Sequence, residues 1–339
     1  MALMFQFQKN LLVKLKNNCR MVFLKDISRL KYFIFFNIKR NIRSVIIPTH
    51  HIEKPIAIVK MDGGLASQMW QYSIGKSIMK RSGLKVKFDL GWFKGNAKDI
   101  NNKQNRNFEL NLAFPNLEIE EASAEEIALY KKAYYIYPLF NCVFKEKILY
   151  DNNPKYLDGY YRNVKYIDKF DFFNYFTTDI NDSNKHLIDL IDKNSPSVAI
   201  HIRRGDFINS LHEVTSPSYF NNAIDRIRSL LMPVEPTFFV FSDDQEYAQQ
   251  IICNQKNLRL FFVDINHNDC GRYDMYLMHQ CNHHIISNSG FGWWPAFLKR
   301  DSQHITIIPS KWINNRASFF LRYKSEEAFV FPGCIRIDV

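Results

Sequence analysis

Two adjacent arginines, Arg203 and Arg204, follow the apolar run 197–202 and precede Gly205 and Asp206. A guanidinium group is costly to bury without an anion, and its planar array of N–H donors matches the oxygens of a phosphate. The pair therefore predicts an anion-binding turn at the end of a buried strand. The alternative is a structural ion pair with Asp206 or another carboxylate, and the residues of the turn alone favour neither.

A second segment suited to an anion follows the apolar run that begins at His284. Here Asn288 and Ser289 precede Gly290 and Phe291, where helical periodicity begins. Ser289 can cap that helix, and the N–H groups of its first turn would then suit a phosphate. Gly290 allows the backbone to approach a ligand closely. The alternative is an ordinary capped helix with no ligand.

Two more turns follow apolar runs, Gly63-Gly64 after 56–60 and Asp243-Asp244 after 237–241. In open parallel sheets, ligands bind at the carboxyl ends of the strands, so we expect all four turns to surround one site. The two glycines would let the backbone of the first half of the chain approach a ligand held by the second half.

Common metal and nucleotide signatures are missing from the sequence. There is no Asp-x-Asp triplet and no G-x-G-x-x-G fingerprint, and the adjacent His283-His284 would point to opposite faces of a strand. Gly75-Lys76-Ser77 resembles the end of a P-loop, but Trp70 stands where that motif needs a glycine. We therefore expect neither a metal nor a cofactor.

Both halves of the chain alternate strands and helices. In the first half, the runs 56–60 and 85–89 flank helical periodicity from Gln68 to Arg81, and a polar surface loop is expected over 94–107. The second half predicts strands at 197–202, 237–241, 258–263 and 284–288, and helices at 219–231, at 273–281 and from 291. This alternation is typical of an α/β protein with parallel sheets.

The predicted organisation is a pair of Rossmann-like domains that face a cleft, residues 51–180 and 181–339, preceded by an extension at residues 1–50. The extension carries ten basic side chains and one acidic one, and so holds +9 of the net charge of +11. Its basic and apolar residues interleave, as is typical of a helix on an anionic membrane, and we expect residues 1–45 to bind such a surface. A helix packed on the body and a poorly ordered leader are the alternatives.

Further composition limits the partners and the compartment. No nucleic-acid-binding motif accompanies the basic charge, so no nucleic acid is expected. The six cysteines are scattered without metal spacing, which indicates a reducing compartment. Neither a secretory signal nor an apolar run of about 18 residues is present, so we expect a cytoplasmic protein.

Five segments together resemble the motifs of one family, in the family's order. Gly63–Tyr72 is similar to G-G-L-G-N-Q-M-F-Q-Y, and Leu157–Tyr166 is similar to L-x-G-Y-W-Q-S-x-K-Y. His201–Asp206 reproduces H-I-R-R-G-D, Phe241–Asp244 reproduces F-S-D-D, and Asn288–Trp294 resembles N-S-T-F-S-W-W. The chain thus resembles the bacterial α-1,2-fucosyltransferases, glycosyltransferase family eleven.

The resemblance implies a GT-B architecture and GDP-β-L-fucose as a co-substrate in place of a cofactor. It implies inverting transfer to the 2-hydroxyl of a β-galactoside in O-antigen-type polysaccharide. Residues 51–180 would face the acceptor, a galactose-terminated glycan that is free or lipid-linked, and residues 181–339 would bind the donor. Such an enzyme would be peripheral to the inner face of the cytoplasmic membrane. Fucose transfer to another linkage or acceptor, and a non-catalytic membrane-surface protein, are the alternatives.

The resemblance also implies roles for single residues. Arg203 would hold the diphosphate together with the helix after Asn288, because an enzyme without a metal must stabilise its leaving group with such donors. The acceptor hydroxyl needs a general base, for which Asp206 is the first candidate and His212 the second. Asp206 could instead pair with an arginine. The residues expected to bind substrate are Gly63, Gly64, Ser67, Gln68, His201, Arg204, Asp243, Asp244, Asn288, Ser289, Gly290 and Phe291.

Five of the positions that depart from the family's pattern bear on the substrates. Ala66 and Ser67 stand where the family has Gly and Asn, and Gly290 and Gly292 stand where it has Thr and Ser. Glu213 occupies a position where Gly is usual. These positions lie beside the expected substrates, so the changes bear on the identity of the acceptor and of the donor.

Overall fold

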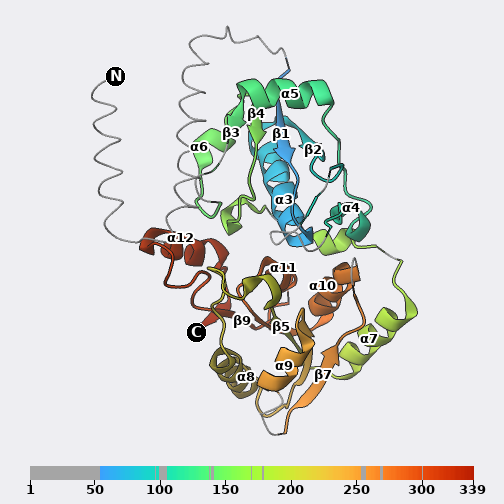
Figure 1. Cartoon of the computed structure of the whole chain (residues 1–339). Helices are drawn as coiled ribbons and strands as arrows, with labels where there is room; N and C mark the ends of the chain where they lie inside the picture. The colour runs from blue at the N-terminus through green and yellow to red at the C-terminus, as the bar shows by residue number, and fades with distance from the viewer. Residues whose placement is uncertain are drawn as a thin grey trace.

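In the computed structural model, the described residues are 54–95, 97, 98, 105–136, 138, 141–168, 170–177, 179–252, 257–267, 270–299 and 301–339. The extension at residues 1–50, with its expected membrane contact, and half of the expected loop at 94–107 lie outside them. The described residues form two α/β domains, one above the other in Figure 1. Among these residues, no helix is both long enough and apolar enough to cross a bilayer.

The first domain contains a four-stranded parallel sheet in the order β2-β1-β4-β3. Its strands are β1 (Ile56–Lys60), β2 (Lys85–Asp89), β3 (Tyr135–Ile136) and β4 (Lys155–Leu157). Its helices are α3 (Leu65–Ser82), α4 (Leu110–Ala113), α5 (Ala124–Ala133), α6 (Glu146–Leu149) and the 3-10 helices η1 (Val164–Tyr166) and η2 (Phe172–Tyr175). The long helix α3 connects β1 to β2 and ends at Gly83, whose φ of +73° suits glycine.

The second domain contains a six-stranded parallel sheet in the order β10-β9-β8-β5-β6-β7. Its strands are β5 (Ser197–Ile202), β6 (Thr237–Ser242), β7 (Arg259–Val263), β8 (His283–Ile286), β9 (Thr306–Pro309) and β10 (Cys334–Ile337). Its helices are α7 (Asp182–Lys193), η3 (Gly205–Phe207), α8 (Pro217–Leu231), α9 (Gln245–Ile252), α10 (Gly271–Gln280), α11 (Gly290–Leu298) and α12 (Phe319–Phe329). The strand order reverses between β5 and β8, and doubly wound sheets bind their ligands at such a reversal.

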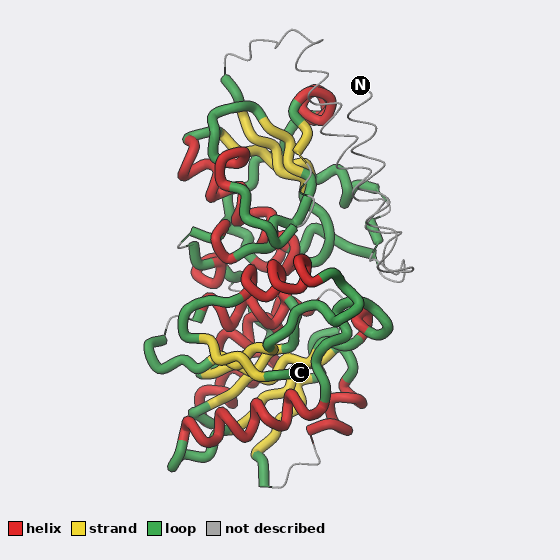
Figure 2. Tube along the Cα trace, turned by 90° about the vertical axis from the view of Figure 1, so that its left-hand side faces the viewer, coloured by secondary structure: helices red, strands yellow, loops and turns green. Residues whose placement is uncertain are grey.

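The two domains share a hydrophobic core where α3 meets α11. The Trp70 ring centroid lies 4.8 Å from that of Trp293 and 4.8 Å from that of Trp294. Trp294 Nε1 donates a hydrogen bond to the Ala66 carbonyl, at 3.1 Å. This contact holds the first turn of α3, which follows β1, beside α11, which follows β8. Figure 2 shows the resulting arrangement, in which helices separate the two sets of strands.

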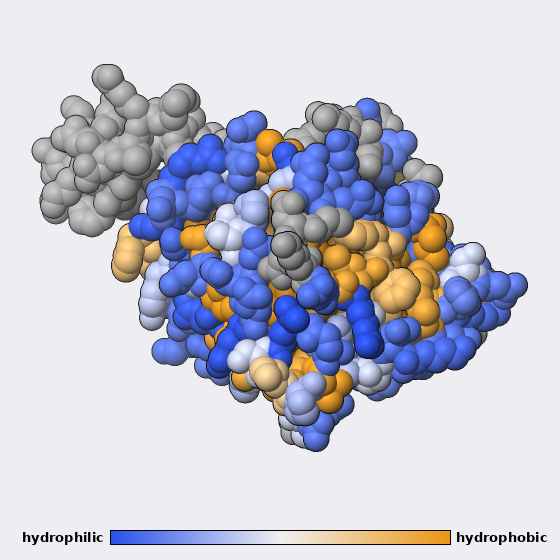
Figure 3. Space-filling model, turned by 90° about the horizontal axis from the view of Figure 1, so that it is seen from below, coloured by the Kyte–Doolittle hydropathy of each residue, from blue (hydrophilic) through white to orange (hydrophobic). Residues whose placement is uncertain are grey.

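The predicted GT-B type of fold, with two Rossmann-like α/β domains, is confirmed, because the turns that follow the two parallel sheets face each other. The chain leaves the first sheet at Leu157 and enters the second at Ser197, so the predicted division near residue 180 falls in the connection. Close to the end of the chain, α12 returns to pack on η1. Seen from below, the second domain presents hydrophobic patches between hydrophilic residues (Figure 3).

Candidate active site

The carboxyl ends of β5 and β8 are joined by Ser287. Its hydroxyl lies 3.0 Å from His201 Nδ1 and accepts a hydrogen bond from the Arg203 N–H at 3.2 Å. Burial and the nearby Arg203 guanidinium lower the pKa of His201 to about 3, so its imidazole is neutral at pH 7. His201 was predicted to bind substrate, and the structure buries it beneath the turn, where it supports Arg203.

Gly292 allows α11 to lie directly on His201. A Cβ atom at position 292 would stand 2.6 Å from the imidazole, closer than real side chains approach. The Phe291 ring also packs on His201, with ring centroids 5.8 Å apart. The departure from the family's motif at position 292 therefore removes a clash between α11 and the end of β5.

Arg203 is held by two carboxylates. Its Nε and one terminal nitrogen donate to Asp206 Oδ1 at 2.9 and 2.7 Å, and the other terminal nitrogen lies 3.1 Å from Asp243 Oδ2. The structural ion pair that the sequence left open is present. These three contacts with Asp206 and Asp243 hold the Arg203 guanidinium in one orientation before any ligand binds.

Asp243 holds the backbone of the arginine turn as well as its side chain. Its carboxylate accepts hydrogen bonds from the N–H groups of Arg204 (2.8 Å) and Gly205 (3.0 Å). A Cβ atom at Gly205 would stand 2.6 Å from Asp243 Oδ2, so this close approach needs glycine. Asp243, predicted to contact substrate, is thus an anchor that ties the turn after β5 to the end of β6.

Arg204 points to another neighbour, the first turn of α9. Its guanidinium carbon lies 3.7 Å from the centroid of the Tyr247 ring, and its Nε lies 3.6 Å from Asp244 Oδ2. Asp244 also accepts the Tyr247 N–H at 3.0 Å, which fixes the start of α9. The arginine turn therefore places two guanidinium groups against three carboxylates, a local charge of −1 from these side chains.

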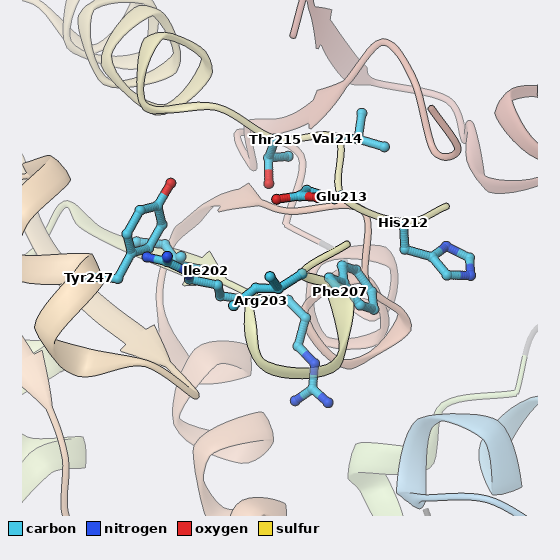
Figure 4. Close-up of a pocket in the computed structure, with 10 residues that line it drawn as sticks. Ile202, Arg203, Phe207, His212, Glu213, Val214, Thr215 and Tyr247 are labelled. Atoms are coloured by element: carbon cyan, nitrogen blue, oxygen red, sulfur yellow. The ribbon is translucent and has the colours of Figure 1, made fainter. Parts of the chain in front are cut away.

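A pocket opens beside this turn, and ten residues between Ile202 and Tyr247 line it. Figure 4 shows the Tyr247 ring on one side, with the Thr215 hydroxyl and the Glu213 carboxylate on the other. Glu213 accepts a hydrogen bond from the Asn209 N–H at 2.9 Å. The pocket thus combines an aromatic face with polar groups, as small-molecule sites commonly do.

His212 and Asn288 meet at the rim of this pocket. The Asn288 amide donates to the carbonyls of His212 (2.9 Å) and Trp312 (3.0 Å), so it holds the backbone of the loop. The His212 ring packs near Phe207 at 5.2 Å and points away from Tyr247 (Figure 4). Asn288, predicted to bind substrate, therefore lies beside His212, the second candidate for the general base, and donates its hydrogen bonds to the protein's own backbone.

Two helix N-termini meet across the domains. Ser289 caps α11 by accepting the Phe291 N–H at 3.3 Å, and α3 begins after Gly64 without a side-chain cap. A Cβ atom at Gly290 would lie 3.5 Å from the Ala66 side chain, which places the two first turns in contact. Neither first turn contains an acidic residue. The positive ends of both helix dipoles therefore favour an anion at this place.

The turn before α3 is built around Gln68, which is fully buried. Its amide nitrogen donates to the Gly63 carbonyl at 2.9 Å and the Asn107 carbonyl at 3.0 Å, and its amide oxygen accepts the Leu110 N–H at 2.8 Å. Gly63 has a φ of +74°, which only glycine adopts easily. Gln68, predicted to bind substrate, thus shapes the glycine turn from beneath.

Two arginines at the edge of the first domain were not singled out from the sequence. Arg162 donates to the Ser67 hydroxyl at 3.3 Å and its guanidinium carbon lies 4.3 Å from the Tyr160 ring centroid. A terminal nitrogen of Arg106 lies 3.4 Å from the place that a Cβ on Gly64 would take. The sequence does hold a signal for Arg162, because this arginine stands where the family's second motif has Gln. Its partner Ser67 stands where the first motif has Asn.

The described residues contain no group of three His, Cys, Asp or Glu side chains that could hold a metal. The family model of Glycosyl transferase family 11 matches residues 98–331. The chain belongs to this family and is a glycosyltransferase, in agreement with the order of its motifs.

Two relatives from Escherichia coli match 76% of this chain. One, named O-antigen biosynthesis glycosyltransferase WbnK, is 28% identical, and the match covers 95% of that protein. The other, named alpha-1,2-colitosyltransferase, is 29% identical, and the match covers 92% of that protein. Among solved structures, the fucosyltransferase NodZ from Bradyrhizobium aligns with a TM-score of 0.44 at 13% identity, over 72% of this chain and 93% of that one.

Proposed function

We propose that the protein transfers L-fucose from GDP-β-L-fucose, with inversion and without a metal, to the 2-hydroxyl of a β-galactoside in O-antigen-type polysaccharide. The observation that carries the proposal is the convergence of Arg203 and the capped N-terminus of α11 at the reversal of strand order, opposite the N-terminus of α3. The relative named O-antigen biosynthesis glycosyltransferase supports the polysaccharide class.

The leaving diphosphate would be held by Arg203 and by the first-turn N–H groups of α11. Negative charge grows on GDP as the bond to fucose breaks, and fixed donors stabilise that charge without having to reorganise. Asp206 and Asp243 hold the guanidinium in place before the donor binds. The donor nucleoside would extend toward the pocket at Tyr247, which offers its ring and the polar groups opposite.

Asp206 remains the first candidate for the general base. Arg203 donates to Oδ1, so the acceptor's proton would pass to Oδ2. His212 is the second candidate, although its ring packs near Phe207 and points away from Tyr247. If an Asp206→Asn variant keeps full glycosyl-transfer activity, the general base is His212 or another group.

We also propose a cytoplasmic location at the inner face of the cytoplasmic membrane, with residues 1–45 bound to anionic lipid. The acceptor would be a galactose-terminated glycan, free or lipid-linked. The support is the composition of the extension, ten basic side chains and one acidic one interleaved with apolar residues.

A second candidate is transfer of colitose from its activated nucleotide, because one relative carries the name alpha-1,2-colitosyltransferase. Incubation with each donor and a panel of β-galactosides, followed by linkage analysis, separates the two. We expect a 2-linked fucosyl product. A colitosyl product alone would favour the second candidate, a fucosyl product of another linkage would correct the acceptor position, and no product with either donor would contradict both.

A further inference from the structure

The helix α12 carries exposed aromatic side chains beside the candidate site. Phe319 is 75% exposed, Tyr323 is 52% exposed and Phe320 is 48% exposed, and we call these three residues the α12 patch. The rings of Phe319 and Tyr323 stack one helical turn apart, with centroids separated by 6.4 Å. A pair of large aromatic rings this exposed on one helix face points to an interaction surface.

The helix is firmly held on its opposite face, so the exposure does not come from loose packing. Leu321, Ser325, Ala328 and Phe329 are all buried on that face. The Phe329 ring stacks on Trp312 with centroids 4.0 Å apart, and its carbonyl accepts a hydrogen bond from an indole N–H of α11 at 2.8 Å. The α12 patch is therefore presented by a fixed element.

Two basic side chains lie near the rings of the α12 patch. The Arg322 guanidinium carbon is 6.0 Å from the Phe319 ring centroid, and Lys324 Nζ is 5.1 Å from the Tyr323 ring centroid. Residues 311–324 contain four basic side chains, Lys311, Arg316, Arg322 and Lys324, and no acidic one. The next two acids along the chain, Glu326 and Glu327, are paired with Arg336 at 3.6 Å and with Lys324 at 2.7 Å. Aromatic rings flanked by Lys and Arg are the composition of a surface that binds anionic lipid.

The segment before α12 is bonded to the loop that lines the pocket. The Asn314 N–H donates to the Leu211 carbonyl at 2.9 Å, and the Asn314 amide donates to the Ser210 carbonyl at 3.0 Å. The Arg316 guanidinium also donates to the Ser210 carbonyl. Within that loop, Ile208 is 43% exposed. A surface that covers the α12 patch would thus lie beside the opening of the pocket.

We propose that the α12 patch docks on an anionic lipid bilayer and presents the candidate site to an acceptor carried by that membrane. This contact is separate from the one expected of residues 1–45. The lipid contact stands on the α12 patch alone, whereas the presentation of an acceptor rests on the proposed function.

The test compares two double variants of the full chain. Phe319→Ser with Tyr323→Ser removes the α12 patch, and Met232→Ser with Val234→Ser removes side chains of equal exposure, 75% and 53%, just before β6 at the amino-terminal edge of the second sheet. Sedimentation with vesicles of phosphatidylglycerol and phosphatidylcholine should show a roughly tenfold loss of binding for the first variant, because aromatic side chains lose their burial in the interface. The second variant should bind as the wild type does.

A gain-of-signal variant tests the lipid contact even if the first double variant misfolds. Phe319→Trp should show quenched, blue-shifted fluorescence with vesicles of brominated phosphatidylglycerol, and Met232→Trp should not. Equal binding by the two double variants, or no quenching of Phe319→Trp, would overturn the proposal. A change of oligomeric state in place of a loss of vesicle binding would identify the patch as a contact between copies and would also overturn it.

Activity separates the two parts of the inference. Both double variants should transfer sugar to a soluble acceptor at the wild-type rate, and only the first should lose transfer to a lipid-linked acceptor in vesicles. If the wild type binds vesicles through the α12 patch but transfers no sugar to either acceptor, the proposed function is wrong and the lipid contact stands. If both acceptors are used equally by the first double variant, the presentation of the acceptor is wrong.

Discussion

The arginines of the two domains have different kinds of partner. In the second domain, Arg203 and Arg204 contact three carboxylates, so the turn after β5 carries no net positive charge of its own. At the edge of the first domain, Arg162 bonds a hydroxyl and stacks on a ring, and Arg106 lies beside the glycine turn. Under the proposed function, the fixed guanidinium of the second domain would hold the donor, and the basic groups of the first domain would lie next to the acceptor.

The largest effect should come from Arg203. Replacement by alanine removes the oriented guanidinium and leaves Asp206 and Asp243 next to the diphosphate, so kcat/KM for fucosyl transfer should fall by roughly a thousandfold. Arg226→Ala, an exposed arginine on α8, serves as the matched control and should behave as the wild type. Steady-state kinetics measure both, and similar rates for the two variants would remove Arg203 from the mechanism.

Asp243 tests whether the carboxylates prepare the turn. Asp243→Asn cannot accept both backbone N–H bonds and the Arg203 ion pair, so we expect roughly a hundredfold loss of kcat/KM and about 1–3 kcal/mol less free energy of unfolding. Asp225→Asn, on the exposed face of α8, is the control for loss of one carboxylate. If Asp243→Asn binds donor more tightly, the carboxylate competes with phosphate instead of preparing its site.

The second domain should also lose stability in mild acid. Burial is the main cause of three lowered histidine pKa values. The pKa of His201 is about 3, and the pKa values of His279 and His304 are about 4. These groups stay neutral in the folded state down to those values, whereas the unfolded chain binds protons below about pH 6.5. Their stabilising contribution is therefore complete above pH 6.5 and is lost as the pH falls toward 4.

Urea unfolding at pH 7 and pH 5 measures this loss, and His304→Gln should reduce the difference between the two. His267, which is 66% exposed, provides the control variant His267→Gln, for which the difference should not change. A free energy of unfolding that rises between pH 7 and pH 5 would show that Asp274 dominates instead, because burial raises the pKa of this carboxyl group to about 7.

The smallest effect is expected at Arg162. Arg162→Gln restores the residue of the family's motif and removes a charge beside Ser67, so the KM for the acceptor should change about tenfold while the KM for the donor stays the same. Arg226→Gln is the matched control. A change confined to the donor would place Arg162 on the other side of the site and would remove the contrast between the domains.

Much of the architecture followed from local sequence. The strands β1, β2 and β5 begin and end at the predicted residues, because β-branched and aromatic runs between polar turns define them clearly. The predicted strand at 284–288 ends earlier, at Ile286, because the next residue turns its hydroxyl to the end of β5. The two-residue strand β3 and the helix α12, whose exposed face is aromatic, had no pattern from which to predict them.

The contacts that define the site could not be predicted from spacing. Arg203 and Asp243 are forty positions apart, and their ion pair depends on β5 and β6 being neighbours. The contact between Ala66 and Gly290 depends on how the domains pack, which no local pattern encodes. Sequence could place the turns at one edge of a sheet, but it could not show that carboxylates already hold the arginines.

Calorimetric titration of GDP measures the proposed diphosphate contact of Arg203. We expect wild-type protein to bind GDP and Arg162→Gln to bind it equally well. Arg203→Ala should bind GDP roughly a hundredfold more weakly, because a charge-assisted diphosphate contact is lost. Equal GDP affinity in the wild type and in Arg203→Ala would show that Arg203 does not hold the diphosphate.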